Sequence, residues 1–239
     1  MDHGRGRRLS LVALAALLVG SGLLAGCGGG EDAASGGGPS TTHATGTTLV
    51  QRAVSAVTPT TASTVPAPPP APGTFVTAPG TSWPAGTGAP RTYTVEVETA
   101  TGVDPTAFAT FVDATLSDPR SWIADGSVSL QRVETGGSAR ILLATPGTTD
   151  ALCAPLRTNG IYSCGQGSTA VINLDRWNEG IDVWTGPIEE YRHYVVNHEF
   201  GHVLSHGHDM CGGAGQLAPV MQQQTKGLDG CLPNGWPYP

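Results

Sequence analysis

Four of the chain's seven histidines lie within one eleven-residue stretch, and their spacing restricts what the chain can form there. The stretch runs from His198 to His208 and begins with the pattern H-E-x-x-H. Residues four apart lie on one face of an α-helix, roughly 6 Å apart along its axis. A helix would therefore direct His198 and His202 at one point, which suits a tetrahedral zinc ion. Glu199 flanks that point and can take a proton from a zinc-bound water, a role it would lack in an inert structural zinc site.

The first 26 residues have the features of an export signal. Arg5, Arg7 and Arg8 precede an apolar run at residues 9–19, which is short for a transmembrane helix. The L-A-G-C run that ends at Cys27 resembles a bacterial lipobox, which implies cleavage before Cys27 and a diacylglyceryl group on its thiol. We therefore expect a lipid anchor that holds the protein on the extracellular side of the cell membrane. An ordinary cleaved secretory signal is the alternative.

Four further cysteines follow, and an oxidising compartment favours disulfides over metal binding for them. They are Cys153, Cys164, Cys211 and Cys231, which allow three pairings. We expect the short-range pairing, Cys153 with Cys164 and Cys211 with Cys231. Each bridge would contribute about 3 kcal/mol through loop closure.

Composition divides the rest of the chain into two parts. Residues 27–88 are mostly Gly, Ser, Thr, Ala and Pro, with too few large apolar side chains to offset the entropy of ordering. We expect a disordered spacer there, and one domain over residues 89–239. The net charge of −7 and the lack of a basic stripe argue against nucleic acid as a partner. We expect a monomer.

Hydrophobic periodicity predicts an α+β domain with a mixed, twisted sheet and two main helices. Alternating or apolar runs predict four strands, at residues 91–98, 128–133, 139–144 and 170–174. Asp104 and Pro105 predict the start of one helix. Pro187 predicts the start of the histidine-bearing helix, which should run to about Leu204. From Ser205 onwards, Gly and Pro predict mostly loops.

Downstream residues extend the motif into a recognisable pattern. His208, six residues past His202, and a later Pro219-Val220-Met221 turn resemble the metzincin clan of zinc endopeptidases. More closely, the H-E-F-G-H and H-G-H runs and the P-V-M-Q-Q-Q-T run, with Cys211 and Cys231 nearby, resemble an actinobacterial family of exported, metzincin-like domains of unknown function. The resemblance covers about residues 90–235, and its specific motifs cover residues 198–231.

This resemblance implies a zincin-like fold and a zinc-dependent peptidase. It implies zinc held by His198, His202 and His208, Glu199 as the general base, and a Met-turn at Met221 beneath the metal. It also implies a peptide or protein substrate that lies extended along an edge strand, for which residues 170–174 are the candidate. A non-catalytic cell-wall binding or scaffold lipoprotein with the same fold is the alternative function.

Ser205 departs from the metzincin pattern, which has glycine where the chain leaves the helix. A left-handed conformation costs a non-glycine residue about 1–2 kcal/mol. Either Ser205 adopts it and His208 turns back toward the metal, or the helix continues and presents His206. His206 would then lie too far along the axis to meet the zinc, so we expect His208, with Asp209 as a weaker third candidate.

The pattern leaves the group that stabilises the oxyanion unassigned. Some zincins carry a Tyr or His after the Met-turn, but Tyr238 lies at the very end of this chain, where termini fray. Tyr191 and Tyr194 precede the motif on its helix, and we expect them in the core or beside the ligands. We expect His193 at the surface.

Overall fold

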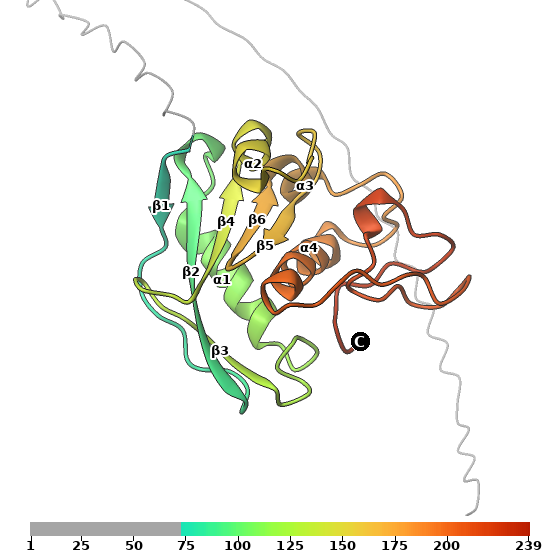
Figure 1. Cartoon of the computed structure of the whole chain (residues 1–239), viewed down its shortest axis with the longest axis horizontal. Coiled ribbons are helices and arrows are strands. Elements are labelled where there is room, and N and C mark those ends of the chain that lie inside the picture. Colours follow the sequence, from blue (N-terminus) through green and yellow to red (C-terminus); the bar gives the residue numbers. More distant parts are fainter. Residues whose placement is uncertain (1–72) are drawn as a thin grey trace, which may run out of the picture. The chain divides into compact units, whose positions relative to one another are not determined.

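A computed structural model describes residues 73–239, which form an α+β domain around one six-stranded mixed sheet (Figure 1). In chain order the elements are β1 (Phe75–Thr77), β2 (Ala89–Glu98), the 3-10 helix η1 (Thr99–Thr101), α1 (Pro105–Ser117), β3 (Val128–Arg132), β4 (Ala139–Ala144), α2 (Pro146–Cys153), β5 (Cys164–Gln166), β6 (Thr169–Asn173), α3 (Leu174–Glu179), α4 (Ile188–Val203) and the 3-10 helix η2 (Gln224–Lys226). The expected signal peptide 1–26, the lipidation site Cys27 and the spacer up to residue 72 lie outside the described residues. Within residues 73–239, no helix is both long and apolar enough to cross a membrane.

The strand order across the sheet is β1-β2-β4-β6-β5, with β3 also paired to β2. β2 pairs parallel with β3 and β4, and β4 pairs parallel with β6. β1 and β5 pair antiparallel with their neighbours, which makes the sheet mixed as expected. The expectation that residues 170–174 form an edge strand is wrong. β6 has β4 on one side and β5 on the other, so β5 is the edge.

The main core lies between one face of the sheet and helices α1 and α4. It combines buried residues of three neighbouring strands and both helices, among them Val95, Ile141, Ile172, Phe108 and Phe200. Because successive strand residues face opposite sides, Leu142 and Val171 join a second cluster with Cys153 of α2. Both faces of the central strands are therefore covered, and α4 packs against one of them.

The two long helices begin close to where the sequence predicts. At the start of α1, the Asp104 carboxylate accepts hydrogen bonds from the backbone N–H groups of Thr106 and Ala107, at 3.1 and 3.3 Å. α4 starts directly after Pro187, which stands at its N-cap. Helices α2 and α3 are absent from the sequence prediction, because segments of 8 and 6 residues carry little periodic signal.

The folded domain begins before the predicted boundary at residue 89. β1 lies inside the range 27–88 that composition assigns to a spacer, and its Phe75 pairs with Glu98 of β2. The buried Glu98 carboxylate accepts hydrogen bonds from the N–H groups of Gly73 and Thr145 and from the hydroxyl of Thr148, each at 2.7 Å. One carboxylate thus joins the first described residues to β2 and to the start of α2.

Two disulfides and a docked tail stabilise the loop-rich parts. The expected pairing is confirmed, with one bridge between Cys153 and Cys164 and the other between Cys211 and Cys231. The C-terminal tail packs on the domain, since the backbone N–H of Tyr238 donates to the carbonyl oxygen of Arg120 at 3.0 Å. Residues after Ser205 are otherwise mostly irregular, as the sequence predicts.

Candidate metal centre

Helix α4 presents His198 and His202 beside the edge strand β5. The two elements touch closely at Gly165, where an added Cβ would lie 2.2 Å from the carbonyl oxygen of Glu199 and 2.8 Å from the Cβ of His202. Only glycine allows this approach. The small residue in β5 therefore brings the strand directly against the part of α4 that carries the motif.

Both helix histidines are oriented by backbone carbonyl groups. His198 Nδ1 lies 2.8 Å from the carbonyl oxygen of Val220, and His202 Nδ1 lies 2.9 Å from that of His206. A carbonyl oxygen only accepts, so each Nδ1 carries the proton and each Nε2 keeps a free lone pair. Burial is the main cause that lowers the pKa of His198, to about 3, so this ring is neutral as a metal ligand must be.

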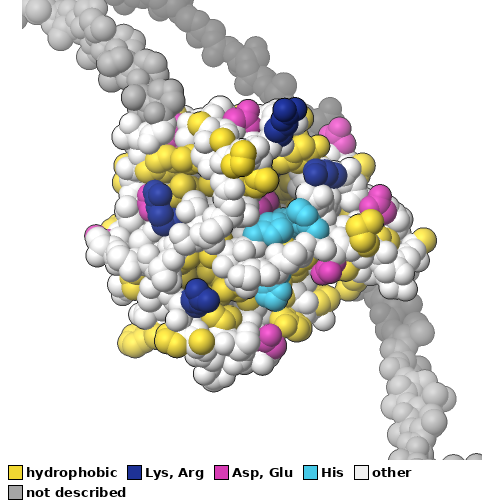
Figure 2. Space-filling model, in the orientation of Figure 1, with side chains coloured by type: hydrophobic (Ala, Val, Ile, Leu, Met, Phe, Trp, Pro, Cys, Tyr) yellow, Lys and Arg dark blue, Asp and Glu magenta, His cyan; other side chains and the backbone are white. Residues whose placement is uncertain are grey.

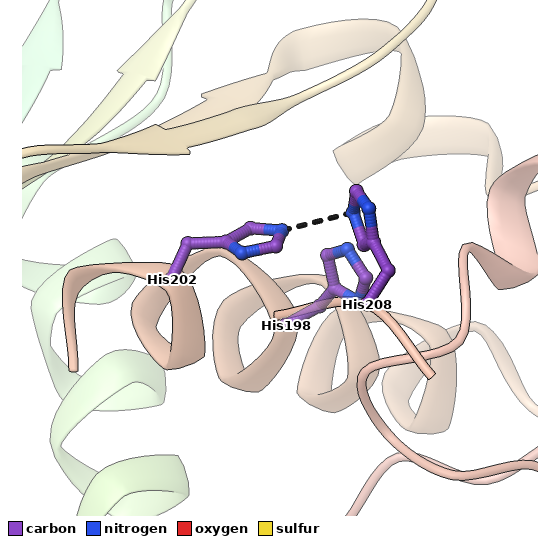
Figure 3. A group of neighbouring side chains, drawn as sticks. All are labelled: His198, His202 and His208. Atoms are coloured by element: carbon purple, nitrogen blue, oxygen red, sulfur yellow. Dashed lines mark hydrogen bonds between the residues drawn. The ribbon is translucent and has the colours of Figure 1, made fainter. Parts of the chain in front are cut away.

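Ser205 ends α4 in the left-handed conformation, with φ 74°. The chain therefore turns back, and His208 approaches the two helix histidines, as Figure 3 shows. His208 Nε2 lies 3.1 Å from His202 Nε2, and one ligand atom from each of the three rings lies within 4.8 Å of the others. His206 instead stacks on Trp122, with 4.1 Å between ring centroids. Among the described residues, Asp209 is not part of this group.

Met221 is buried beneath this part of α4 and explains the glycine within the motif. A Cβ at Gly201 would lie 2.5 Å from the Met221 Sδ and 2.6 Å from the Trp122 ring. The backbone N–H of Gln222 donates to the carbonyl oxygen of Pro219 at 2.9 Å, which closes a tight turn around Val220 and Met221. This turn supplies the carbonyl group that orients His198.

Glu199 is a buried carboxylate in the wall of the same cavity. Burial raises its pKa to about 8, and no hydrogen bond or charge from the described residues lowers it. A buried carboxylate without such a partner is costly in a purely structural role. A divalent cation held by the neighbouring imidazoles would favour its charged form.

The donor set fits a zinc ion. Three imidazole nitrogens are a common catalytic zinc set, in which a fourth position stays open for water or substrate. Two nitrogens bound tetrahedrally to one zinc lie about 3.3 Å apart, from Zn–N distances near 2.0–2.1 Å. The 3.1 Å between the Nε2 atoms of His202 and His208 is close to that value.

A cavity of about 250 Å³ opens beside the three histidines. Its second wall comes from the loop that precedes β5, which contributes Leu156, Arg157, Thr158, Tyr162 and Ser163, and from the segment at η2, which contributes Gln223, Thr225 and Lys226. Sequence reasoning did not find these residues, because they come from loops without a motif. Cys153 and Cys164, which bracket the loop before β5, were the only sequence feature that pointed to this wall.

Several residues around the motif differ from expectation. His193 is not a free surface residue: its Nδ1 lies 2.8 Å from the Thr115 hydroxyl, and its ring stacks on Phe111 with 4.6 Å between centroids. Tyr238 is bound to the domain, since its hydroxyl donates to Asp125 at 3.1 Å, and it does not line the cavity.

The two tyrosines of α4 are buried as expected. Tyr191 contacts the Thr225 hydroxyl, and Tyr194 donates to the Gln222 carbonyl oxygen. Both hydroxyls therefore support the segment that follows the Met221 turn. Tyr194 also lines the cavity, 5.3 Å from His198 between ring centroids.

In comparisons with known proteins, the chain matches the model of a family whose function is unknown. A family model described as "protein of unknown function (DUF3152)" matches residues 62–232. This range includes β1, the three histidines, Glu199 and both disulfides. No curated protein and no solved structure matches the chain.

Proposed function

We propose that this chain, which belongs to the DUF3152 family of proteins of unknown function, is a zinc-dependent peptidase of the metzincin type. One observation carries the proposal. Three imidazole groups with ligand atoms within 4.8 Å of one another share a cavity with the unpaired, buried carboxylate of Glu199. The match to the longer motif, with His208 after a left-handed turn and Met221 beneath α4, agrees with it.

His198, His202 and His208 would hold the zinc ion. When bound, zinc supplies a Lewis acid that polarises a substrate carbonyl group and acidifies water. The carbonyl groups of Val220 and His206 orient the first two rings, so their Nε2 lone pairs are available without rearrangement. This pre-orientation would favour metal binding.

Glu199 would move the proton during peptide hydrolysis. Its carboxylate accepts a proton from the attacking water and returns that proton to the nitrogen of the leaving amine. A cation held by the neighbouring imidazoles would favour the charged form of this carboxylate, which can then accept the proton. No hydrogen bond from residues 73–239 competes for the carboxylate oxygens.

The edge strand β5 would align the substrate. It lies at the end of the sheet and packs on α4 through Gly165, next to His202 and Glu199. A peptide added in extended form along β5 would pass over the cavity, held by main-chain hydrogen bonds. The proposal also includes export and a lipid on Cys27, which rest on the sequence of residues 1–27.

The decisive test combines metal analysis with cleavage of a peptide library. The full chain should contain about one zinc ion per molecule and cleave peptides. Glu199→Ala should keep the zinc and lower kcat/KM by about 100-fold or more, the scale of general acid–base catalysis. Glu189→Ala, which removes an exposed carboxylate of the same helix, should leave cleavage unchanged.

Three results would overturn the peptidase proposal. Purified chain without near-stoichiometric zinc would contradict the metal centre. Zinc without cleavage, or wild-type cleavage by Glu199→Ala, would contradict the mechanism. Zinc without cleavage would favour the non-catalytic cell-wall scaffold.

A further inference from the structure

The cavity beside the histidines has an uneven charge. Arg157 and Lys226 both line it, and both are exposed to solvent. Its only acidic residue is Glu199, which is buried. Figure 2 shows basic side chains on the same face as the histidines. The accessible charge of this cavity is therefore positive.

Neither of these two cations has a carboxylate partner in the described part of the chain. The ion pairs of residues 73–239 involve other arginines, namely Arg120, Arg132, Arg140 and Arg176. Lys226 is also the only lysine of the whole sequence. Neither group is therefore paired within the described residues, although Asp209 and Asp229 share a neighbouring hollow with Lys226.

The two cations stand on separately anchored segments. Arg157 belongs to the loop closed by the Cys153–Cys164 disulfide, and Asp150 fixes this loop by accepting hydrogen bonds from Thr158 and Gly160. Lys226 is the last residue of η2. Its Nζ lies 5.4 Å from the centroid of the Tyr162 ring, which lines the same cavity. Tyr162 belongs to the same loop as Arg157, and both of these residues line the cavity together with Lys226.

We propose that Arg157 and Lys226 bind a carboxylate group of the peptide substrate. The proposal deepens the peptidase function and rests on it for the identity of the ligand. A guanidinium group pairs with a carboxylate through two parallel hydrogen bonds, and an ammonium group adds a point charge. The carboxylate comes from an acidic side chain or from the free C-terminus of the peptide.

Binding tests this inference without catalysis. The full chain carrying Glu199→Ala is used as purified so that peptides are not consumed, and fluorescein-labelled peptide pools are titrated by fluorescence anisotropy. One pool carries a single Glu, and a matched pool carries Gln. We expect the Glu pool to bind about threefold to tenfold more tightly at low salt, the range for solvent-exposed ion pairs. Salt at about 1 M should remove the difference.

A further arm separates the two sources of carboxylate. Gln peptides are compared as C-terminal free acids and as amides. Preference for the free acid with no preference for Glu assigns the site to the terminal carboxylate, and the reverse assigns it to a side chain. Equal binding in both comparisons, or no binding by any pool, overturns the proposal.

Charge variants tie the preference to the named residues. Arg157→Gln and Lys226→Gln should each reduce the preference, and the double variant should abolish it. Arg91→Gln removes an exposed arginine of β2 that does not line the cavity, and it should keep the preference. A preference that persists in the double variant would refute the assignment.

The cleavage assay distinguishes this failure from failure of the peptidase proposal. Zinc-loaded chain that cleaves Gln peptide amides as well as it cleaves Glu peptides and free acids refutes the carboxylate site alone. Chain that binds acidic peptides selectively but cleaves none refutes the peptidase function alone.

Discussion

At the residue scale, Ser205 determines whether three histidines meet. Its N–H donates to the carbonyl oxygen of His202 at 2.9 Å, and the N–H of His206 donates to that of Gly201 at 2.9 Å. These are the two hydrogen bonds of a Schellman C-cap, with Ser205 in the left-handed position that glycine usually occupies. The same turn directs the His206 carbonyl group toward His202 and brings His208 into the cluster.

Glycine at this position should therefore stabilise the protein. We expect Ser205→Gly to raise the free energy of unfolding by about 0.5–1 kcal/mol, because glycine adopts positive φ without steric cost but is more flexible when unfolded. Urea unfolding measures the change, and metal analysis should show the same zinc content. Ser205→Ala keeps the steric cost and serves as the control. A loss of stability in Ser205→Gly would show that the serine is not strained.

At the element scale, Glu98 joins three segments that are distant in the sequence. Burial alone would raise the pKa of its carboxyl group, but hydrogen bonds from Gly73, Thr148 and Thr145 hold the pKa below its usual value. A lowered folded pKa means that the carboxylate contributes stability above the unfolded pKa, near 4.3. That contribution is lost as the pH falls through the folded pKa.

Glu98→Gln should show this dependence. At pH 7 we expect the variant to lose about 2 kcal/mol of unfolding free energy, the scale of hydrogen bonds to a charged group. Below pH 4.3 the wild type should lose stability as its carboxylate is protonated, so the difference between the two proteins should shrink. Urea unfolding from about pH 7 to pH 3 measures both, with the exposed Glu189→Gln as control. A difference that stays constant with pH would contradict the role of the charge.

At the scale of the whole molecule, the candidate metal centre joins α4 to the segment that follows it. His198 and His202 belong to the helix, whereas His208 belongs to the irregular C-terminal part. The turn at Met221 contacts the helix through the hydrogen bond between Val220 and His198, and the Cys211–Cys231 disulfide closes that part on itself. A bound metal would therefore stabilise the native state, because the unfolded chain lacks the assembled site.

Zinc removal should lower the melting temperature. With free zinc at about 1,000 times its Kd, binding contributes about 4 kcal/mol. For a domain of this size, chelation should then lower the melting temperature by about 10 °C. Calorimetry with and without chelator measures the shift. His208→Ala should remove most of it, and His206→Ala should retain it. An equal shift in both variants would place the metal elsewhere.

Local sequence signals predicted the local features of the fold. The cap at Asp104, the span of α4 and the short-range disulfides depend on residues close together in the chain. Elements of three residues, such as β1 and β5, could not be predicted, because so short a segment has no readable period. The edge of the sheet was misplaced at residues 170–174 for this reason.

By itself, the sequence determined that His198, His202 and Glu199 stand near one point, because helical geometry relates residues four apart. Only the tertiary structure decided that Ser205 turns left-handed and that His208 returns to the cluster. It also decided which loops form the cavity, since Arg157 and Lys226 both line it although they lie far apart in the sequence. Such contacts depend on how the sheet, the disulfides and α4 pack together, and no local pattern encodes that packing.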